Sequence, residues 1–445
     1  MENLQPFTTA PGMSAAVAIG GDLVWTGVRG WADVADSIPV TPDSRFRLAS
    51  VSKLFTATLA LRLIESGQLD PDADIRNYVP SWPEHGGAIT PRHLAAHTSG
   101  INHYESLAAS DYMSGEHYPD ILESLAFFAN APLLAAPGEA YSYSSFGYAL
   151  LNAVMQGASG QTLAAGLDAQ ILGPLGLEQT SLEDVRQLPP ESVTLYRADD
   201  GGRQNPVDLD DQSFVWGATG MRSTPRDLVR FGEAFLHGDL VSTATRDWAL
   251  RPARLVDGST VSTDRYEIGF GWRVGEDWGH RRVAHHAGST RGARTILLGY
   301  PDHAAVVALV VNGTWTSRIE TTAELIAAPF MEEGADAEAC PTGEWSIEGT
   351  LEGEPESGIL TLGIEDNLCT GLLQSEGAFA ERWSAPPPRT FPVVRVARRD
   401  GTHIFALAYP WGLARLTVRP ADTWLAIDGD IVGWPLVLRG TSERD

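Results

Sequence analysis

The sequence is most unusual for how little lysine it contains. Of its 32 lysine and arginine residues, only Lys53 is a lysine. Its 57 acidic residues give a formal net charge of −25, which argues against nucleic-acid and anionic-membrane partners, since both require a basic face. The longest apolar run, residues 304–311, is far too short to span a bilayer. We therefore expect neither a nucleic-acid partner nor a membrane partner.

Cysteine, an export signal and one common hydrolase motif are also scarce or missing. The two cysteines, Cys340 and Cys369, are too few for a disulfide framework or a metal cluster, and we expect two free thiols. The first residues lack a basic segment followed by an apolar one, so a cytoplasmic location is expected. No G-x-S-x-G motif is present, which disfavours an α/β-hydrolase.

What the sequence does contain indicates two domains, since 445 residues exceed the usual size of one core. Strand patterns in the first forty residues and in residues 266–313 flank a region of helices and loops. This order predicts an α+β domain, residues 1–333, with an antiparallel sheet flanked by helices and a mostly helical insertion. Short strand-like runs in residues 334–445 predict an all-β domain, barrel or sandwich.

One serine and the single lysine lie together where a helix is expected to begin. Ser50 and Lys53 are three residues apart, so their side chains share a face. The following residues, with Leu54, Ala57 and Leu61 at helical spacing, predict a largely buried helix. Burial lowers the pKa of a lysine and lets it accept the serine proton, whereas arginine stays protonated. An S-x-x-K match by itself also arises by chance, because serine is common.

Two other stretches offer partners for this pair. Tyr143 precedes Ser145 in a polar loop that leads into an apolar helix. His286 lies on a predicted strand before Gly288, where a glycine allows close approach of a ligand to the backbone. Taken singly, Tyr143 is equally explained as a packed tyrosine, and His286 as a hydrogen-bonded strand histidine.

Together these stretches resemble the serine β-lactamase and penicillin-binding-protein superfamily, and in detail its class C β-lactamase-like serine hydrolases. The motifs S-x-x-K, Y-x-N and K-T-G or H-x-G occur there in this order. "SGINHYE" and "YSSFGY" are similar to the peptidase-type group that includes the mitochondrial β-lactamase-like protein and its bacterial relatives. The C-terminal region is similar in placement to lipocalin-like appendages of D-aminopeptidase-type members.

The resemblance implies a role for each matching residue. Ser50 would form an acyl-enzyme, while Lys53 and Tyr143 share the proton transfers, with the identity of the base left open. The backbone N–H groups of Ser50 and Ser289, just after Gly288, would form an oxyanion hole. His286 would line the cleft and hydrogen-bond to Tyr143 or to the substrate.

Two departures from the family pattern bear on the substrate. Ser145 stands where β-lactamases carry an asparagine that binds the substrate amide. His286 replaces the lysine of K-T-G, a permanent cation that attracts the β-lactam carboxylate. We therefore expect a small-molecule or peptide substrate with an amide, peptide or ester bond, and no cofactor. A genuine β-lactamase or D,D-peptidase is the alternative.

Three further hypotheses remain from the residues alone. His93 and His97 have the spacing of a metal-ligand pair, but no third ligand follows from the sequence, and we predict no metal site. Tyr104, Tyr112 and Tyr118 are candidates for the cleft wall or for plain loop anchors. A catalytically retired scaffold, sensor or filament subunit is a third reading, and the chain is compatible with a homo-oligomer.

Overall fold

The computed structural model contains two compact units. Contacts group residues 11–275 with 282–314 in one unit, and residues 276–281 with 315–445 in the other. The structure describes residues 10–103, 116–199, 203–313, 319–331, 340–365, 368–383, 390–409, 412–421, 424–431 and 434–442. Within these ranges no helix is long and apolar enough to cross a membrane.

The first unit is built on an eight-stranded antiparallel sheet in the order β3-β2-β1-β13-β12-β11-β10-β9. Its strands are β1 (Gly12–Ile19), β2 (Asp22–Asp33), β3 (Ile38–Pro39), β9 (Glu267–Ile268), β10 (Arg273–Glu276), β11 (Arg282–Thr290), β12 (Ala293–Tyr300) and β13 (Ala305–Val311). β1 pairs with β13, with Ala16 opposite Ala308. The prediction that strands from both ends of this region form one antiparallel sheet is confirmed.

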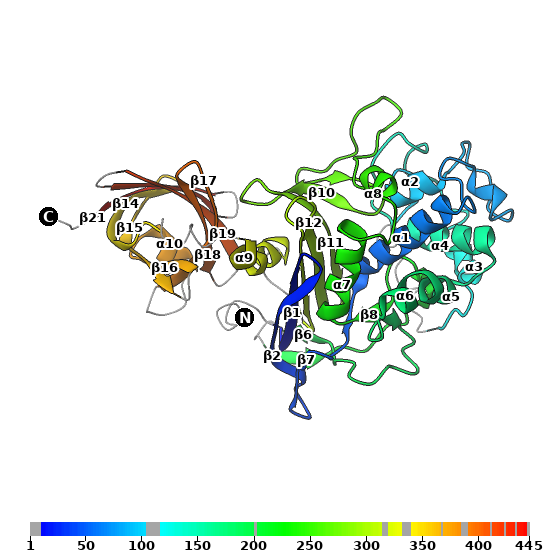
Figure 1. Ribbon diagram of the computed structural model, residues 1–445, viewed down its shortest axis with the longest axis horizontal. Coiled ribbons are helices and arrows are strands. Elements are labelled where there is room, and N and C mark those ends of the chain that lie inside the picture. Colours follow the sequence, from blue (N-terminus) through cyan, green and yellow to red (C-terminus); the bar gives the residue numbers. More distant parts are fainter. Residues whose placement is uncertain are drawn as a thin grey trace. The chain divides into compact units, whose positions relative to one another are not determined.

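Helices cover this sheet and form the insertion between its two halves (Figure 1). Their bounds are α1 (Ser52–Glu65), α2 (Pro91–Ala95), α3 (Ile121–Ser124), α4 (Ser145–Ser159), α5 (Leu163–Leu167), α6 (Gly173–Leu175), α7 (Pro225–Leu236) and α8 (Thr243–Ala249). α7 packs on β1, β12 and β13, while α1 and α2 both contact α4. Short strands complete the unit: β4 (Phe46–Arg47), β5 (Ser181–Leu182), β6 (Tyr196–Ala198), β7 (Gln204–Pro206) and β8 (Met221–Ser223).

The sequence around α1 and α2 determines where these helices lie. All residues of α1 are buried except Arg62, Ile64 and Glu65, as a helix that is apolar on most of its circumference requires. α2 begins at Pro91, because the Thr90 side chain accepts a hydrogen bond from the His93 N–H and proline suits the first turn of a helix. α1 is therefore a buried helix, and its N-terminal end lies in the interior of the unit.

The second unit contains a closed eight-stranded barrel, which confirms the predicted barrel-like C-terminal domain. Its strands are β14 (Gly343–Leu351), β15 (Glu354–Glu365), β16 (Leu368–Ser375), β17 (Thr390–Arg399), β18 (Thr402–Tyr409), β19 (Gly412–Pro420), β20 (Trp424–Ile431) and β21 (Trp434–Ser442). α10 (Ala378–Trp383) follows β16, and α9 (Ile319–Met331) contacts β17. Apolar side chains such as Ile347, Phe391 and Leu407 form the core of this unit, as in small barrels.

The expectation of two free thiols is wrong. Cys340 and Cys369 form a disulfide that joins the start of the barrel to β16, with their Cα atoms 5.5 Å apart. The two residues are 29 positions apart in the sequence, so only the pairing of the barrel strands brings them within bonding distance. A cysteine count could not reveal this, because the distance depends on tertiary structure.

We predict that Cys340→Ser together with Cys369→Ser lowers the free energy of unfolding of the barrel by about 3 kcal/mol, since the open chain regains loop-closure entropy. Chemical denaturation followed by the barrel tryptophans would measure the loss. Dithiothreitol should produce the same shift in the wild-type protein and none in the double variant. Equal denaturation midpoints for the wild-type protein, the dithiothreitol-treated wild-type protein and the double variant would contradict a stabilising disulfide.

Candidate active site

Ser50 occupies a strained turn at the N-terminal end of α1. It is the middle residue of a short 3-10 helix, Ala49–Val51, that runs directly into α1. Ala49 has a φ of 48°, a left-handed conformation that is costly for a residue with a Cβ. Ser50 itself is half-buried, so its hydroxyl combines a fixed position with partial access from outside.

Lys53 lies one turn further along α1 and is completely buried. Its Nζ is 3.2 Å from Ser50 Oγ, 3.2 Å from Ser145 Oγ and 3.0 Å from the Ala218 carbonyl oxygen. Burial lowers the pKa of Lys53, and the positive charge of Arg273 lowers it further, although the Tyr143 phenol acts in the opposite direction. The amine is therefore displaced towards its neutral form.

Tyr143 reaches the same serine from the loop that precedes α4. Its hydroxyl donates a hydrogen bond of 2.8 Å to Ser50 Oγ, and Lys53 Nζ lies 4.9 Å from the centre of its ring. Burial raises the pKa of this phenol, but the charges of Lys53 and Arg273 outweigh burial and the net shift of the pKa is downward. The structure thus brings together the three residues predicted from S-x-x-K and the Y-x-S stretch.

The contacts of Lys53 allow two complete arrangements of protons. A neutral amine has two N–H donors and one lone pair, so it can donate to Ser145 and Ala218 while it accepts the Ser50 hydroxyl proton. Alternatively, an ammonium donates to all three oxygens and a Tyr143 phenolate accepts the Ser50 proton. In either arrangement Ser50 Oγ has a base within hydrogen-bonding reach.

β11 runs against the backbone of this turn, and Gly288 makes the closest approach. A Cβ on Gly288 would lie 2.3 Å from the Leu48 carbonyl oxygen, 2.3 Å from Thr295 Oγ1 and 3.1 Å from Ser50 N. The Thr295 hydroxyl also donates a hydrogen bond of 2.6 Å to the Leu48 carbonyl oxygen. Glycine is the residue whose lack of a side chain lets the strand and the turn meet.

The other sequence-predicted residues lie beside this group. Ser145 is buried, and its hydroxyl contacts Lys53. His286 is also buried; its Nδ1–H donates to the Ala287 carbonyl oxygen at 2.7 Å, and its ring centre is 6.3 Å from that of Tyr143. Burial and the charges of Arg273 and Lys53 hold the pKa of His286 well below its usual value, so the ring is neutral. Ser289, which follows Gly288 in β11, is exposed.

Three residues of the site were not predicted from the sequence. His97 and His103 both contact the Tyr143 ring, with ring centres 4.4 Å and 5.4 Å away. The guanidinium carbon of Arg273 lies 5.7 Å from the Tyr143 ring centre and 4.7 Å from that of Tyr266. His103 lies in the stretch "SGINHYE" and His97 lies two residues before it, but nothing in these residues indicates that both rings face Tyr143.

Of the tyrosines considered for the cleft wall, Tyr104 and Tyr112 lie outside the described residues. Tyr118 is half-buried; its hydroxyl donates to a Glu116 carboxylate oxygen at 3.0 Å, and its backbone N–H donates to Ser213 Oγ at 2.8 Å. These contacts agree with a loop anchor.

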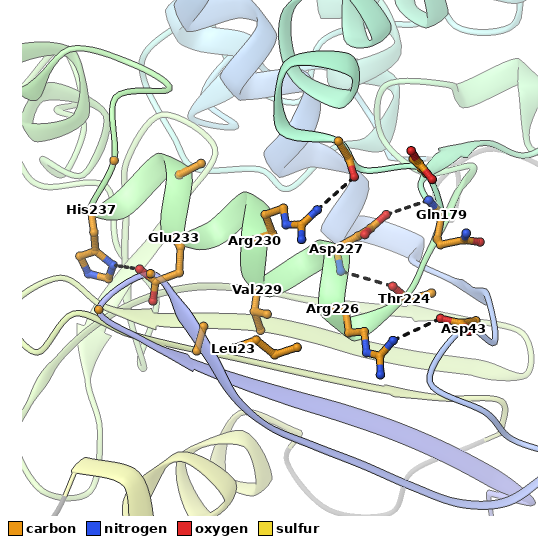
Figure 2. A pocket seen from close by; sticks show the side chains of 17 residues that line it. Leu23, Asp43, Gln179, Thr224, Arg226, Asp227, Val229, Arg230, Glu233 and His237 are labelled. Atoms are coloured by element: carbon orange, nitrogen blue, oxygen red, sulfur yellow. Dashed lines mark hydrogen bonds and ion pairs between the residues drawn. The ribbon is translucent and has the colours of Figure 1, made fainter.

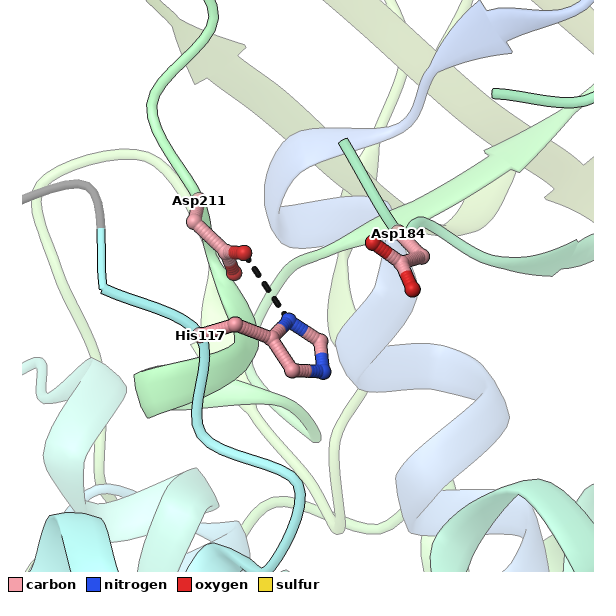
Figure 3. A group of neighbouring side chains, drawn as sticks. All are labelled: His117, Asp184 and Asp211. Carbon is pink, nitrogen blue, oxygen red and sulfur yellow. Dashed lines mark hydrogen bonds and ion pairs between the residues drawn. The ribbon is translucent and has the colours of Figure 1, made fainter. Parts of the chain in front are cut away.

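One cluster of metal-ligating groups occurs near these loops: His117, Asp184 and Asp211, with ligand atoms within 4.8 Å of one another (Figure 3). Arg186 already pairs with Asp184 at 2.6 Å, and His117 Nδ1 is 2.9 Å from an Asp211 carboxylate oxygen. Because its acidic groups already have cationic or N–H partners, we read the cluster as an ion-pair network and assign it no metal.

A pocket of about 680 Å³ lies along α7 and the β1–β2 hairpin (Figure 2). Four of its charged side chains form two pairs, Arg226 with Asp43 at 3.4 Å and His237 with Glu233 at 2.9 Å. None of Ser50, Lys53 and Tyr143 lines it. The pocket therefore adds nothing to the site around Ser50.

Comparison with known proteins finds a matching family model and several relatives. A family model described as Beta-lactamase matches residues 2–328. A penicillin-binding protein of Bacillus subtilis is 30% identical over 311 residues, which cover 66% of each chain. The mitochondrial serine beta-lactamase-like protein LACTB of Homo sapiens is 26% identical over 425 residues, 74% of this chain and 78% of the other. Esterase EstB of Burkholderia gladioli is 33% identical over 282 residues, 54% of this chain and 70% of the other.

Two solved structures extend the comparison. The octameric penicillin-binding protein homologue of Pyrococcus abyssi, 19% identical, superimposes with a TM-score of 0.64 over 98% of this chain and 97% of the other. D-amino acid amidase of Ochrobactrum anthropi is 25% identical, with a TM-score of 0.56 over 68% of this chain and 87% of the other. The first likeness therefore includes the region of the barrel.

We predict that Gly288→Ala lowers kcat/KM for an activated ester by about a hundredfold, because the added methyl group must displace the turn that carries Ser50. Steady-state kinetics would measure the loss. Gly363→Ala, a strand glycine whose Cβ would meet nothing within 4 Å, is the matched control. Wild-type rates for Gly288→Ala would show that this contact does not position the nucleophile.

Proposed function

The chain belongs to the Beta-lactamase family and is a serine hydrolase, and we propose that it cleaves a small amide, peptide or ester bond through an acyl-enzyme on Ser50. The observation that supports the proposal is that two groups, a phenol and an amine, both contact the Ser50 hydroxyl. Tyr143 OH is 2.8 Å and Lys53 Nζ is 3.2 Å from Ser50 Oγ. A serine hydroxyl needs such a neighbour to become a nucleophile.

In the first half of the reaction, Ser50 Oγ attacks the substrate carbonyl carbon while its proton passes to Lys53 or Tyr143. The tetrahedral intermediate collapses as the bond to the leaving nitrogen or oxygen breaks. That atom receives a proton from the pair, by way of Tyr143, and the acyl group stays on Ser50. Water then attacks the carbonyl carbon of the acyl-enzyme and gives a proton to the pair. The bond to Ser50 Oγ breaks, Ser50 Oγ takes a proton back from the pair, and the acid is released.

The developing negative charge on the carbonyl oxygen needs donors that are already in place. We assign this role to the backbone N–H groups of Ser50 and Ser289. The tight contact of Gly288 with the Ser50 backbone supports the assignment, because it holds β11 against the nucleophilic turn. One such donor commonly contributes about 3 kcal/mol to transition-state stabilisation.

The residues that differ from β-lactamases support a substrate other than a β-lactam. Ser145 points its hydroxyl at Lys53 and is 2% exposed, which leaves it little surface for a substrate amide. His286 is neutral and gives the cleft no permanent cation at the K-T-G position. Relatives that include an esterase and a D-amino acid amidase fit an ester or amide substrate. A genuine β-lactamase or D,D-peptidase is the second candidate.

A retired scaffold is the less favoured reading. Loss of function usually removes a chemical group, but here the hydroxyl, the amine and the phenol are in mutual contact.

For the hydrolase, we assign the chemistry to residues 1–333 and another role to residues 334–445. We also propose that the protein forms a homo-oligomer, and the octameric homologue supports this proposal.

The cytoplasmic location expected from the sequence stays a prediction. The disulfide between Cys340 and Cys369 weighs against it, because structural disulfides persist mainly in oxidising compartments.

We predict that Lys53→Arg loses at least about a thousandfold in the rate at which a fluorophosphonate labels Ser50, because a guanidinium stays protonated and cannot accept the serine proton. Tyr143→Phe should lose about a hundredfold or more. The labelling rate and the labelled residue would be followed by mass spectrometry of the intact and digested protein.

Arg62→Lys, a basic exchange on the same helix, is the control and should label at the wild-type rate. Rapid labelling of Lys53→Arg would remove the amine from the mechanism. A wild-type protein without label on Ser50 would favour the scaffold.

We further predict that p-nitrophenyl esters or aminoacyl anilides are hydrolysed with a kcat/KM at least about tenfold above that for nitrocefin, since the K-T-G position has a neutral histidine in place of the lysine that attracts the β-lactam carboxylate. Parallel assays of esters, D- and L-aminoacyl anilides, linear peptides and nitrocefin would rank the substrates. A kcat/KM highest for nitrocefin would reverse the order of the two candidates.

A further inference from the structure

The loop that carries Tyr143 is held on both sides of the tyrosine by one residue, His97. The His97 carbonyl oxygen accepts a hydrogen bond of 2.8 Å from the Ser142 N–H. His97 Nδ1 accepts another, of 3.2 Å, from the Ser144 N–H. The imidazole also lies against the phenol ring between them, with centres 4.4 Å apart and planes inclined by 38°. Three contacts from one residue thus bracket Tyr143.

His97 adopts a conformation that its side chain makes costly. Its φ is 58°, in the left-handed region that glycine and asparagine occupy most readily. It lies just after α2 and is 4% exposed. A glycine would make this turn with less strain, so a histidine here indicates that the ring is used.

His103 makes the same two kinds of contact, one with the next backbone N–H group and one with the Tyr143 ring. Its Nδ1 accepts a hydrogen bond of 3.2 Å from the Ser145 N–H, and its ring meets the Tyr143 ring edge-on, with centres 5.4 Å apart. Ser144 is the N-cap of α4 and Ser145 its first residue. The first amides of a helix have no partner within it. The two imidazoles supply acceptors for two of them.

Both rings must keep Nδ1 unprotonated to accept these hydrogen bonds. Burial holds the pKa of His97 well below its usual value, and the charges of Lys53 and Arg273 act in the same direction. Burial and the charge of Lys53 lower the pKa of His103 to about 4. Each ring is therefore a neutral acceptor near pH 7, with its proton on Nε2.

We propose that His97, together with His103, is a positioning residue that fixes the phenol of Tyr143 at hydrogen-bonding distance from Ser50 Oγ. This inference rests on the proposed function, because it concerns the proton transfers at Ser50. Neither imidazole exchanges a proton with the substrate. His97 acts through Tyr143, so its effect on the rate depends on the presence of the phenol.

A double-mutant cycle tests this dependence. His97→Gly keeps the left-handed turn but removes the acceptor and the ring. We expect it to lower the rate of Ser50 labelling by a fluorophosphonate by about a hundredfold when Tyr143 is present. In the Tyr143→Phe background the same substitution should cost no more than about threefold, because the group that it misplaces is absent.

His97→Asn is the conservative variant. Its side-chain oxygen can take the place of Nδ1, and asparagine tolerates the left-handed conformation. We expect it to recover most of the labelling rate, to within about tenfold of the wild type, and to leave KM for a p-nitrophenyl ester within about threefold.

Three outcomes would overturn the inference. An equal loss from His97→Gly with and without the Tyr143 hydroxyl would show a merely structural role. A wild-type labelling rate in His97→Gly would show no role at all. If His97→Gly does not fold, as judged by its thermal transition, His103→Ala enters the same cycle, and equal losses in both backgrounds refute the proposal. A wild-type protein that is not labelled at Ser50 would instead refute the proposed function.

Discussion

The site depends on an amine that is kept away from water. Lys53 is 0% exposed, and among the described residues its hydrogen-bond partners are two hydroxyls and one carbonyl oxygen rather than a carboxylate. An ammonium in such surroundings loses hydration and gains an opposite charge only where Tyr143 is a phenolate, so burial favours the neutral amine. This one constraint explains why a chain that otherwise uses arginine has a lysine here.

The fold brings three segments that are far apart in the sequence together around the Ser50 hydroxyl. The buried helix α1 supplies Ser50 and Lys53, the loop before α4 supplies Tyr143, and β11 presses Gly288 against the turn. Strained backbone occurs at Ala49, directly before the nucleophile, and at His97, beside the loop that carries Tyr143. Strain of this kind persists where the surrounding structure holds it, and it often marks functional sites.

Part of this arrangement could be predicted from the sequence because it is local, whereas the role of Tyr143, 93 positions from Ser50, was implied by the family resemblance. The S-x-x-K spacing places two side chains on one helical face, and strand alternation predicts both the sheet and the barrel. The contacts that were missed join residues far apart in the chain. His97 meets Ser144 across 47 positions, and Cys340 meets Cys369 across 29 positions. The positions of Arg273 and of the Ala218 carbonyl beside Lys53 and Tyr143 likewise have no local signature.

The most direct test of the account is the ionisation of Lys53 itself. Because the chain has a single lysine, labelling the lysine ε-carbon with carbon-13 gives one resonance, whose shift follows the charge of this amine alone. Titration of the folded wild-type protein should give a midpoint clearly below 10.5, the ordinary pKa of a lysine side chain. A midpoint at or above that value would mean that Lys53 is permanently charged at working pH, which would contradict a neutral amine at the site and would leave Tyr143 as the group that accepts the Ser50 proton.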